Sequence, residues 1–173
     1  MVAYYKLGTN LKITLHNDFL TNLDVMALNI KREGDEREAT RIINIYNQRE
    51  LGEHISMIYT SNCITDLQWD PAILTIITGD WNICHPLWDS GVTSACPRTC
   101  ETLEWINGNG FTLCNKPFVP TREDTLGHSS VINLTFKNTA ANGGNIIKNH
   151  YMDTSIGTLS DHHVIVFQVG DQD

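Results

Sequence analysis

Hydrophobic and polar residues alternate in the first half of the chain with the two-residue period of β-strands. Residues Asp24 to Lys31 (DVMALNIK) follow this alternation, which is typical of a strand with one buried face. A charged segment comes next, and Thr40 to Asn47 (TRIINIYN) then predicts a second strand. Together the two segments predict an antiparallel pair of strands with a long polar connection.

A continuous apolar run follows at Pro71 to Gly79 (PAILTIITG), as expected for a strand buried on both faces. Helical spacing of apolar residues is found in two segments, Glu50 to Leu67 and Arg98 to Asn109. Four further segments are predicted to be strands: Phe111–Asn115, Ser130–Phe136, Asn145–Met152 and His163–Val169. Many strands and few helices predict a layered α/β or α+β sandwich, in one domain spanning residues 1–173.

Acidic residues outnumber basic ones, and this limits the partners that the chain can bind. Twelve Lys and Arg residues against twenty Asp and Glu residues give a formal net charge of −8. Tight non-specific binding of nucleic acid needs many basic side chains, so this chain is a poor candidate for it. The balance still permits an enzyme that binds phosphodiesters through a divalent cation, because such cation sites require carboxylates.

No targeting segment is evident. The longest apolar runs fall well short of the ~20 residues that cross a bilayer, and the N-terminus lacks the charged and apolar regions of a signal peptide. We therefore expect an intracellular protein, cytoplasmic or nuclear. The five cysteines are expected to be reduced there, since their odd number and irregular spacing do not form a disulfide framework.

Polar side chains cluster where several predicted strands begin or end. Asp80 and Asn82 follow the buried apolar run, and Asn133 lies inside SVINLTF. Asp161 and His162 come directly before the last predicted strand. Polar residues in such positions often form turns, but strand ends are also where active sites are commonly built.

These residue types suit the hydrolysis of a phosphodiester. Asp80 could orient and deprotonate a water molecule, while Asn82 donates a hydrogen bond to a phosphoryl oxygen. His162 could supply a hydrogen bond or a proton, and Asp161 could bind a hard cation such as Mg²⁺. Tyr46 could reach a phosphate with its phenol, although a strand aromatic that packs on the core is the simpler interpretation.

Several motifs, taken in order, resemble a known family. They are GDWN (Gly79–Asn82), HPLWDS (His85–Ser90), SVINLTF (Ser130–Phe136) and LSDHHVI (Leu159–Ile165). This series resembles the endonuclease/exonuclease/phosphatase superfamily, and more narrowly the endonuclease domain of LINE-type (non-LTR) retrotransposons. INIYN (Ile43–Asn47) is similar to the family's tyrosine-bearing strand.

The resemblance implies roles for the matching residues. Asp80 would activate water, Asn82 would bind phosphate, and Tyr46 would contact the phosphate or the transition state. Asp161 would lie near the metal ion. His162 would bind phosphate and transfer a proton.

The resemblance also implies a fold, a cofactor and a partner. The fold would be two packed mixed or antiparallel sheets flanked by helices. The cofactor would be Mg²⁺ or Mn²⁺, and the partner a DNA phosphodiester. Asn47 and His85 are expected beside this substrate.

Two departures from the family pattern reduce the activity that we expect. No strand–helix–strand with an Asn and a metal-binding Glu is found before Asp24, and Val2–Asn10 (VAYYKLGTN) resembles the strand that follows that Glu. The fold is therefore expected to lack these first elements, with a weakened metal site and exposed strand edges that a homodimer or a complementing chain could cover.

The second departure is Asn133, which stands where the family has an Asp that pairs with the histidine. An amide can accept a hydrogen bond from the ring but carries no charge. We therefore expect an endonuclease-like domain with weak or lost phosphodiesterase activity. The alternative is a non-catalytic binding or interaction module that keeps the fold.

Overall fold

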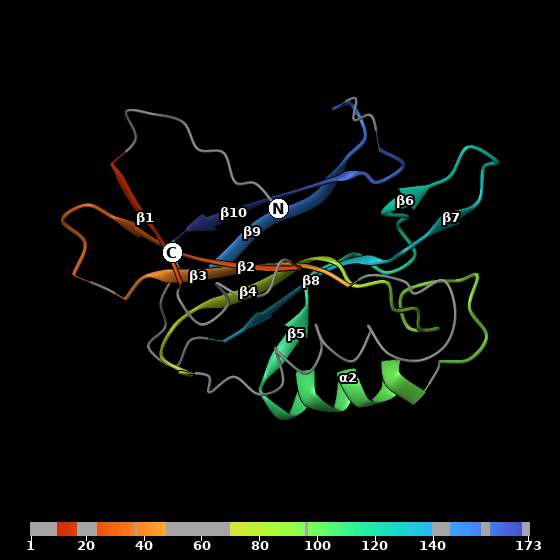
Figure 1. The fold of residues 1–173 in the computed structure, drawn as a ribbon, viewed down its shortest axis with the longest axis horizontal. Coiled ribbons are helices and arrows are strands. Elements are labelled where there is room, and N and C mark those ends of the chain that lie inside the picture. Colours follow the sequence, from red (N-terminus) through yellow and green to blue (C-terminus); the bar gives the residue numbers. More distant parts are fainter. Residues whose placement is uncertain are drawn as a thin grey trace.

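The computed structural model describes residues 10–16, 24–36, 38–47, 70–95, 97–139, 146–156 and 160–170. Most of the described elements are strands, arranged around one central sheet (Figure 1). The strands and the helix are, in chain order, β1 (Leu11–Leu15), β2 (Val25–Arg32), β3 (Thr40–Tyr46), β4 (Thr75–Asp80), α2 (Pro97–Gly108), β5 (Phe111–Leu113), β6 (Arg122–Glu123), β7 (Ser129–Ser130), β8 (Asn133–Asn138), β9 (Ile146–Asp153) and β10 (Val164–Gly170).

The central sheet has six strands in the order β1-β2-β3-β4-β8-β5. The pair β3–β4 is parallel, and the other neighbouring pairs are antiparallel. The predicted antiparallel pairing of β2 with β3 is confirmed, with Ala27 opposite Ile43. Two smaller two-stranded sheets, β9–β10 and β6–β7, complete the strand pairing.

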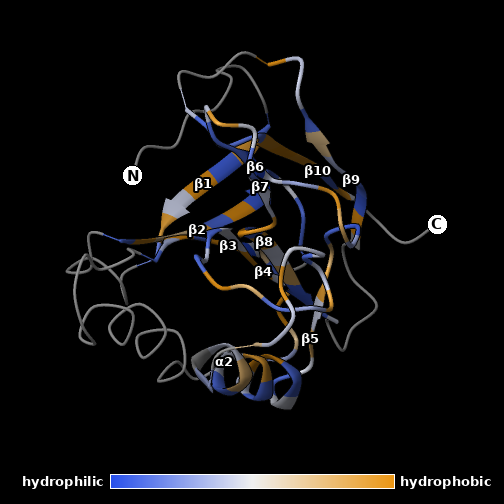
Figure 2. Cartoon of the chain, turned by 90° about the vertical axis from the view of Figure 1, so that its right-hand side faces the viewer, coloured by the Kyte–Doolittle hydropathy of each residue, from blue (hydrophilic) through white to orange (hydrophobic). Residues whose placement is uncertain are grey.

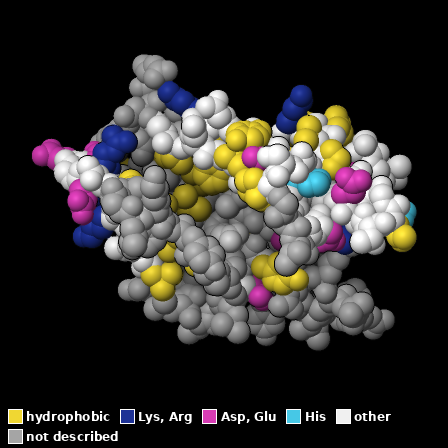
Figure 3. All heavy atoms as spheres, turned by 90° about the horizontal axis from the view of Figure 1, so that it is seen from above, with side chains coloured by type: hydrophobic (Ala, Val, Ile, Leu, Met, Phe, Trp, Pro, Cys, Tyr) yellow, Lys and Arg dark blue, Asp and Glu magenta, His cyan; other side chains and the backbone are white. Residues whose placement is uncertain are grey.

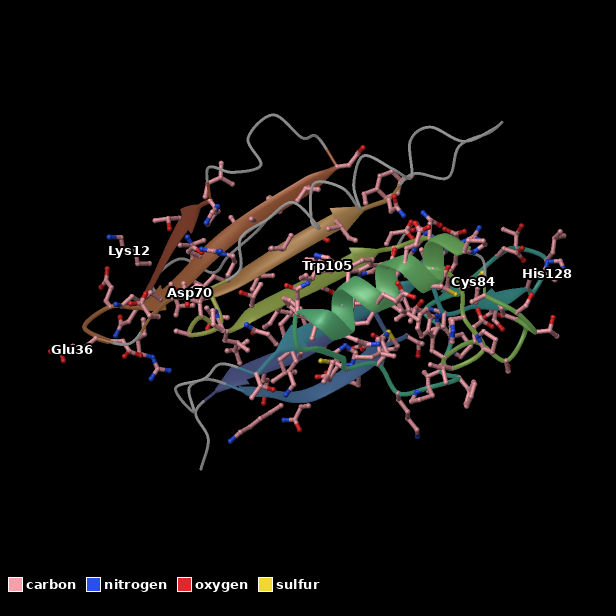
Figure 4. The ribbon with its side chains drawn as sticks, turned by 90° about the horizontal axis from the view of Figure 1, so that it is seen from below. Lys12, Glu36, Asp70, Cys84, Trp105 and His128 are labelled. Atoms are coloured by element: carbon pink, nitrogen blue, oxygen red, sulfur yellow. The ribbon has the colours of Figure 1, made fainter. Side chains whose placement is uncertain are left out.

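The elements are arranged in layers. The β9–β10 hairpin lies on one side of the central sheet and α2 on the other (Figures 1 and 2). Trp105 of α2 stacks on Phe111 of β5, with ring centroids 5.9 Å apart, so that the helix is anchored on the end strand of the sheet (Figure 4). The predicted layered sandwich of mixed and antiparallel sheets is confirmed.

The hydrophobic core lies around β4 and β8. Ile76 and Ile77 are consecutive residues of β4, and both are fully buried. Since consecutive side chains of a strand point to opposite faces, both faces of β4 are covered, as its apolar run predicted. On β8, Leu134 and Phe136 are buried on one face and Thr135 on the other, and Trp81 packs edge-on against Phe136.

Several predicted strands are shorter than their apolar runs. Strand β4 begins only at Thr75, because Asp70 forms a turn in which it accepts hydrogen bonds from the backbone N–H groups of Ala72 and Ile73. The predicted strand Ser130–Phe136 is divided between β7 and β8. Between these strands the backbone N–H groups of Val131 and Ile132 donate to the side chains of Asp89 and Thr121.

Two other elements, β1 and β6, were not predicted. Strand β1 (LKITL) alternates apolar and polar residues over only five positions, and β6 has just two residues. Strand β1 forms one end of the described sheet, and its Leu11 and Leu15 are exposed. Seen from above, hydrophobic side chains also gather along the middle of the molecule's upper face (Figure 3). The helix predicted at Glu50 to Leu67 lies outside the described residues.

The helix that is described, α2, has 12 residues. In the part of the chain that the structure describes, no helix is long and apolar enough to cross a membrane.

Gly79 is required where β3 and β4 lie closest together. Its φ angle is +130°, and a Cβ atom at this position would overlap the carbonyl oxygen of Ile45. Gly34, in the turn between β2 and β3, also has a positive φ angle, of +78°, but has no atom within 4 Å of the position where a Cβ would lie. Comparing substitutions at the two glycines therefore distinguishes the cost of backbone strain from the cost of steric overlap.

We expect Gly79→Ala to lower the free energy of unfolding by about 3 kcal/mol, because it combines a strained φ angle with overlap of the neighbouring strand. Gly34→Ala should cost only about 1 kcal/mol, since it introduces strain alone. Urea unfolding of both variants measures the difference. Equal losses would show that the close approach of β3 and β4 does not require glycine.

Candidate active site

Three candidate residues lie in one row across the central sheet. Tyr46 of β3 is aligned with Asp80 of β4, and Asp80 is aligned with Asn133 of β8. Aligned residues of neighbouring strands place their side chains on the same face. A cleft of about 410 Å³ is lined by this row together with His162 and His163.

His162 is held in the cleft by Asn133. Its Nδ1 lies 2.9 Å from Oδ1 of Asn133, while Nδ2 of Asn133 donates to the carbonyl oxygen of Thr121 at 3.3 Å. The carbonyl of Thr121 fixes the orientation of the amide, so Oδ1 faces the ring. Nδ1 of His162 therefore carries a proton, and this N–H donates a hydrogen bond to Oδ1 of Asn133.

The other ring nitrogen of His162 faces two carboxylates. Nε2 lies 4.0 Å from Oδ2 of Asp80 and 3.6 Å from Oδ1 of Asp161. With Nδ1 protonated toward Asn133, the proton that His162 can gain or lose is the one on Nε2. The structure thus brings together Tyr46, Asp80, Asn133, Asp161 and His162, which the sequence places far apart.

Asp161 has a second partner that the sequence did not indicate. Nε of Arg122 donates to Oδ2 of Asp161 at 2.6 Å, and both side chains are about one-third exposed. The Arg122 side chain, by this hydrogen bond first and also by its charge, holds the pKa of Asp161 below its ordinary value of 3.8. Asp161 is therefore ionised at neutral pH.

Thr121 supports Asn133 from below the cleft. This fully buried side chain accepts hydrogen bonds through Oγ1 from the backbone N–H groups of Ile132, at 3.0 Å, and Asn133, at 2.9 Å. Two more buried side chains act on the same segment. Asp89 accepts from the N–H of Val131, and Asn115 bonds the backbone of β8 on both sides of Leu134.

Asn47 and Asn82 lie in the turn after the row rather than along the cleft. Asn82 has a φ angle of +48°, and its Nδ2 donates to the carbonyl oxygen of Asn47. Asn47 is buried and donates from Nδ2 to the carbonyl oxygen of Trp81 at 2.7 Å. Both amides thereby hold together the ends of β3 and β4. The roles in phosphate and substrate binding expected for them remain predictions.

His85 lies in the loop that follows this turn. Its Nδ1 accepts a hydrogen bond from the N–H of Leu87 at 3.0 Å, and its ring packs on Trp88 with centroids 5.1 Å apart. It does not line the described cleft. These contacts stabilise the loop, and the expected contact of His85 with a substrate remains a prediction.

The described oxygen atoms of the cleft do not fit a resident divalent cation. Oδ2 of Asp161 is bonded to Arg122, and Oδ1 of Asn133 to His162. Oδ1 of Asp80 accepts from the N–H of Asn82 at 3.1 Å. Among the described residues, no group of three or more His, Cys, Asp or Glu side chains could hold a metal ion. Asp161 is the partner of Arg122, and its expected place near a metal ion remains a prediction.

Layered sheets with this row of polar residues define a domain of the endonuclease/exonuclease/phosphatase class. Residues 40–166 match the family described as endonuclease-reverse transcriptase, and the chain belongs to that family. No curated protein matches the chain.

A solved structure shares the fold. The endonuclease domain of TRAS1, a telomere-specific non-LTR retrotransposon, matches with a TM-score of 0.69 at 20% sequence identity, over 91% of this chain and 66% of that domain. The present chain thus spans just under two thirds of the TRAS1 domain. An endonuclease/exonuclease/phosphatase family protein from Bacteroides thetaiotaomicron matches with a TM-score of 0.45 at 12% identity, over 84% of this chain and 55% of that one.

Thr121 provides a first test of the site. Thr121→Val keeps the shape of the side chain but leaves the N–H groups of Ile132 and Asn133 without their acceptor. We expect the free energy of unfolding to fall by about 3 kcal/mol, since each buried donor left unsatisfied costs about 1–3 kcal/mol. Thr121→Ser keeps the hydroxyl and should cost less. Urea unfolding measures both, and equal losses would contradict the role of the hydroxyl.

The Arg122–Asp161 pair predicts a pH dependence. Because the pKa of Asp161 is lowered in the folded protein, this group stabilises the fold above its unfolded pKa, and that contribution is lost as the pH falls through the folded pKa. Arg122→Gln should raise the pKa of Asp161 toward 3.8. A carboxyl ¹³C NMR titration measures the shift, and an unchanged midpoint would mean that Arg122 is not its cause.

Proposed function

We propose that this domain binds a DNA phosphodiester in the cleft and hydrolyses it slowly. The observation that carries the proposal is the position of Nε2 of His162, which faces Asp80 while Nδ1 is committed to Asn133. A base and an acid are thereby held side by side in one cleft. Membership of the endonuclease-reverse transcriptase family supports DNA as the substrate.

Each residue of the row would have a distinct task. The carboxylate of Asp80 would take a proton from the attacking water. His162, protonated on Nε2, would donate its Nε2 proton to a phosphoryl oxygen or to the leaving oxygen. Tyr46 lies at the same level of the sheet and is 46% exposed, so its phenol is free to contact a phosphoryl oxygen.

Two features support a low rate. Asn133 holds the ring of His162 but brings no negative charge to stabilise the imidazolium form. Asp161 is paired with Arg122, so one of the two carboxylates near His162 already has another cationic partner. The same two features favour a second candidate function, a binding module that keeps the phosphate cleft without turnover.

Nicking of supercoiled plasmid by purified protein tests the proposal, with added Mg²⁺ and with EDTA in parallel. We expect weak nicking that Asp80→Ala and His162→Ala abolish, because each removes one of the two proton-transferring groups. Asn133→Asp should increase the rate by roughly tenfold or more, since it returns a charge to the partner of His162. The control is His128→Ala, which alters an exposed histidine of the β6–β7 hairpin.

Absence of nicking by both the wild type and Asn133→Asp, with both proteins folded by circular dichroism, would reject hydrolysis. The binding module would then be the function to pursue. Nicking that persists in His162→Ala would mean that the activity does not come from this cleft. Asn133→Asp is also expected to be less stable by about 1–3 kcal/mol, because a carboxylate oxygen would face the carbonyl of Thr121.

A further inference from the structure

Arg122 lies directly opposite His162. The two residues form an isolated antiparallel bridge, flanked by hydrogen bonds from Glu123 N to Asp161 O and from His163 N to Thr121 O, both 2.9 Å. Residues opposite one another in an antiparallel pair place their side chains on the same face. Arg122 therefore extends from the backbone on the same side as His162, which lines the cleft.

The guanidinium of Arg122 is held in place but retains free donors. Only Nε is bonded, to Asp161, while the two terminal nitrogens make no hydrogen bond with the described residues. The side chain is 31% exposed. A guanidinium presents several N–H groups in a fixed plane, which suits the paired oxygens of a phosphate. Asp161 fixes this plane without using the donors that face away from it.

The charges around the cleft make this arginine important. Asp80 and Asp161 are both close to His162, and the chain as a whole carries a net charge of −8. A phosphodiester anion entering the cleft therefore meets negative charge. Arg122 is the described cation that is bonded within this group of side chains, and the described residues do not provide a site for a divalent cation in its place.

We propose that Arg122 is a phosphate-binding residue of the cleft, whose guanidinium, oriented by Asp161, binds an oxygen of the phosphodiester and makes binding independent of a divalent cation. The inference rests on the proposed function and names the group that recognises the substrate. The inference concerns only the binding of the phosphodiester, so a binding assay tests it, while the nicking assay tests the proposed function.

Fluorescence anisotropy of a short fluorescein-labelled single-stranded DNA, at low ionic strength and in EDTA, measures this binding. We expect the wild type to bind and Arg122→Gln to bind about tenfold more weakly, because the variant removes a charged hydrogen-bond donor to the phosphate. Arg122→Lys keeps the charge without the planar donors and should lie in between. The matched control is Arg32→Gln, which removes the same charge from the exposed end of β2 and should leave affinity within about twofold of the wild type.

Equal affinities of Arg122→Gln and Arg32→Gln would overturn the proposal, because the effect would then be one of net charge. The proposal would also be overturned if the wild type binds DNA only in the presence of Mg²⁺. It would equally be overturned if Arg122→Gln binds DNA more tightly than the wild type in Mg²⁺, which would mean that Arg122 blocks a cation site. If Arg122→Gln does not fold, the affinity of Arg122→Lys for the DNA tests the proposal instead. An affinity equal to that of the wild type would contradict a contact made by the planar guanidinium. Nicking without loss of binding in the Arg122 variants rejects this inference but leaves the proposed function intact.

Discussion

The site depends on the place of β4 between β3 and β8. Parallel pairing with β3 aligns Tyr46 with Asp80, and antiparallel pairing with β8 aligns Asp80 with Asn133. Gly79 makes the first pairing possible, because any side chain there would overlap the carbonyl of Ile45. A shift of the pairing by one residue would move every side chain of β4 to the opposite face and break the alignment of Asp80 with Tyr46 and Asn133. The packing of the core therefore also sets the geometry of the cleft.

The presence of an amide at position 133 affects charge more than geometry. An asparagine beside a histidine can turn its NH₂ group toward the ring and force the wrong tautomer. In serine proteases, replacing the Asp that is hydrogen-bonded to the catalytic histidine with Asn lowers turnover by ~10⁴, because the histidine takes the wrong tautomer. Here the carbonyl of Thr121 takes the NH₂ group, and Oδ1 of Asn133 stays directed at Nδ1 of His162. The cost should therefore be smaller than ~10⁴, because the tautomer is retained and only the electrostatic stabilisation of the imidazolium is lost.

The sequence predicted the elements whose evidence is local. Alternation gave β2 and β3, a continuous apolar run gave β4, and the order of the motifs indicated the family and the residues of the row. Residues held by long-range polar contacts could not be found in this way. Thr121 and Asp89 look like ordinary loop residues, yet their partners lie 11 to 12 and 42 residues away. Neither periodicity nor spacing carries a signal for such pairs.

Arg122 was missed for a related reason. An arginine in a loop is most simply a solvated surface charge, and the bridge to His162 and the bond to Asp161 give it a place in the site. That bridge depends on β6, a strand of two residues with no hydrophobic pattern of its own. Its position follows from the backbone contacts of Thr121 and Glu123 with residues 161–163.

The entry into β8 shows why the cleft depends on loops as well as on the sheet. Backbone groups that leave a sheet must find other partners when they are buried. Between Val131 and Thr135 several of these partners are side chains from three separate loops, contributed by Asp89, Asn115 and Thr121. Each is a short polar residue in a fully enclosed position, where an apolar replacement would leave a donor or an acceptor unsatisfied. The position of His162 therefore depends on the three loops that hold Asn133 in place. A substitution in any of them can weaken the site without touching a residue that faces the substrate.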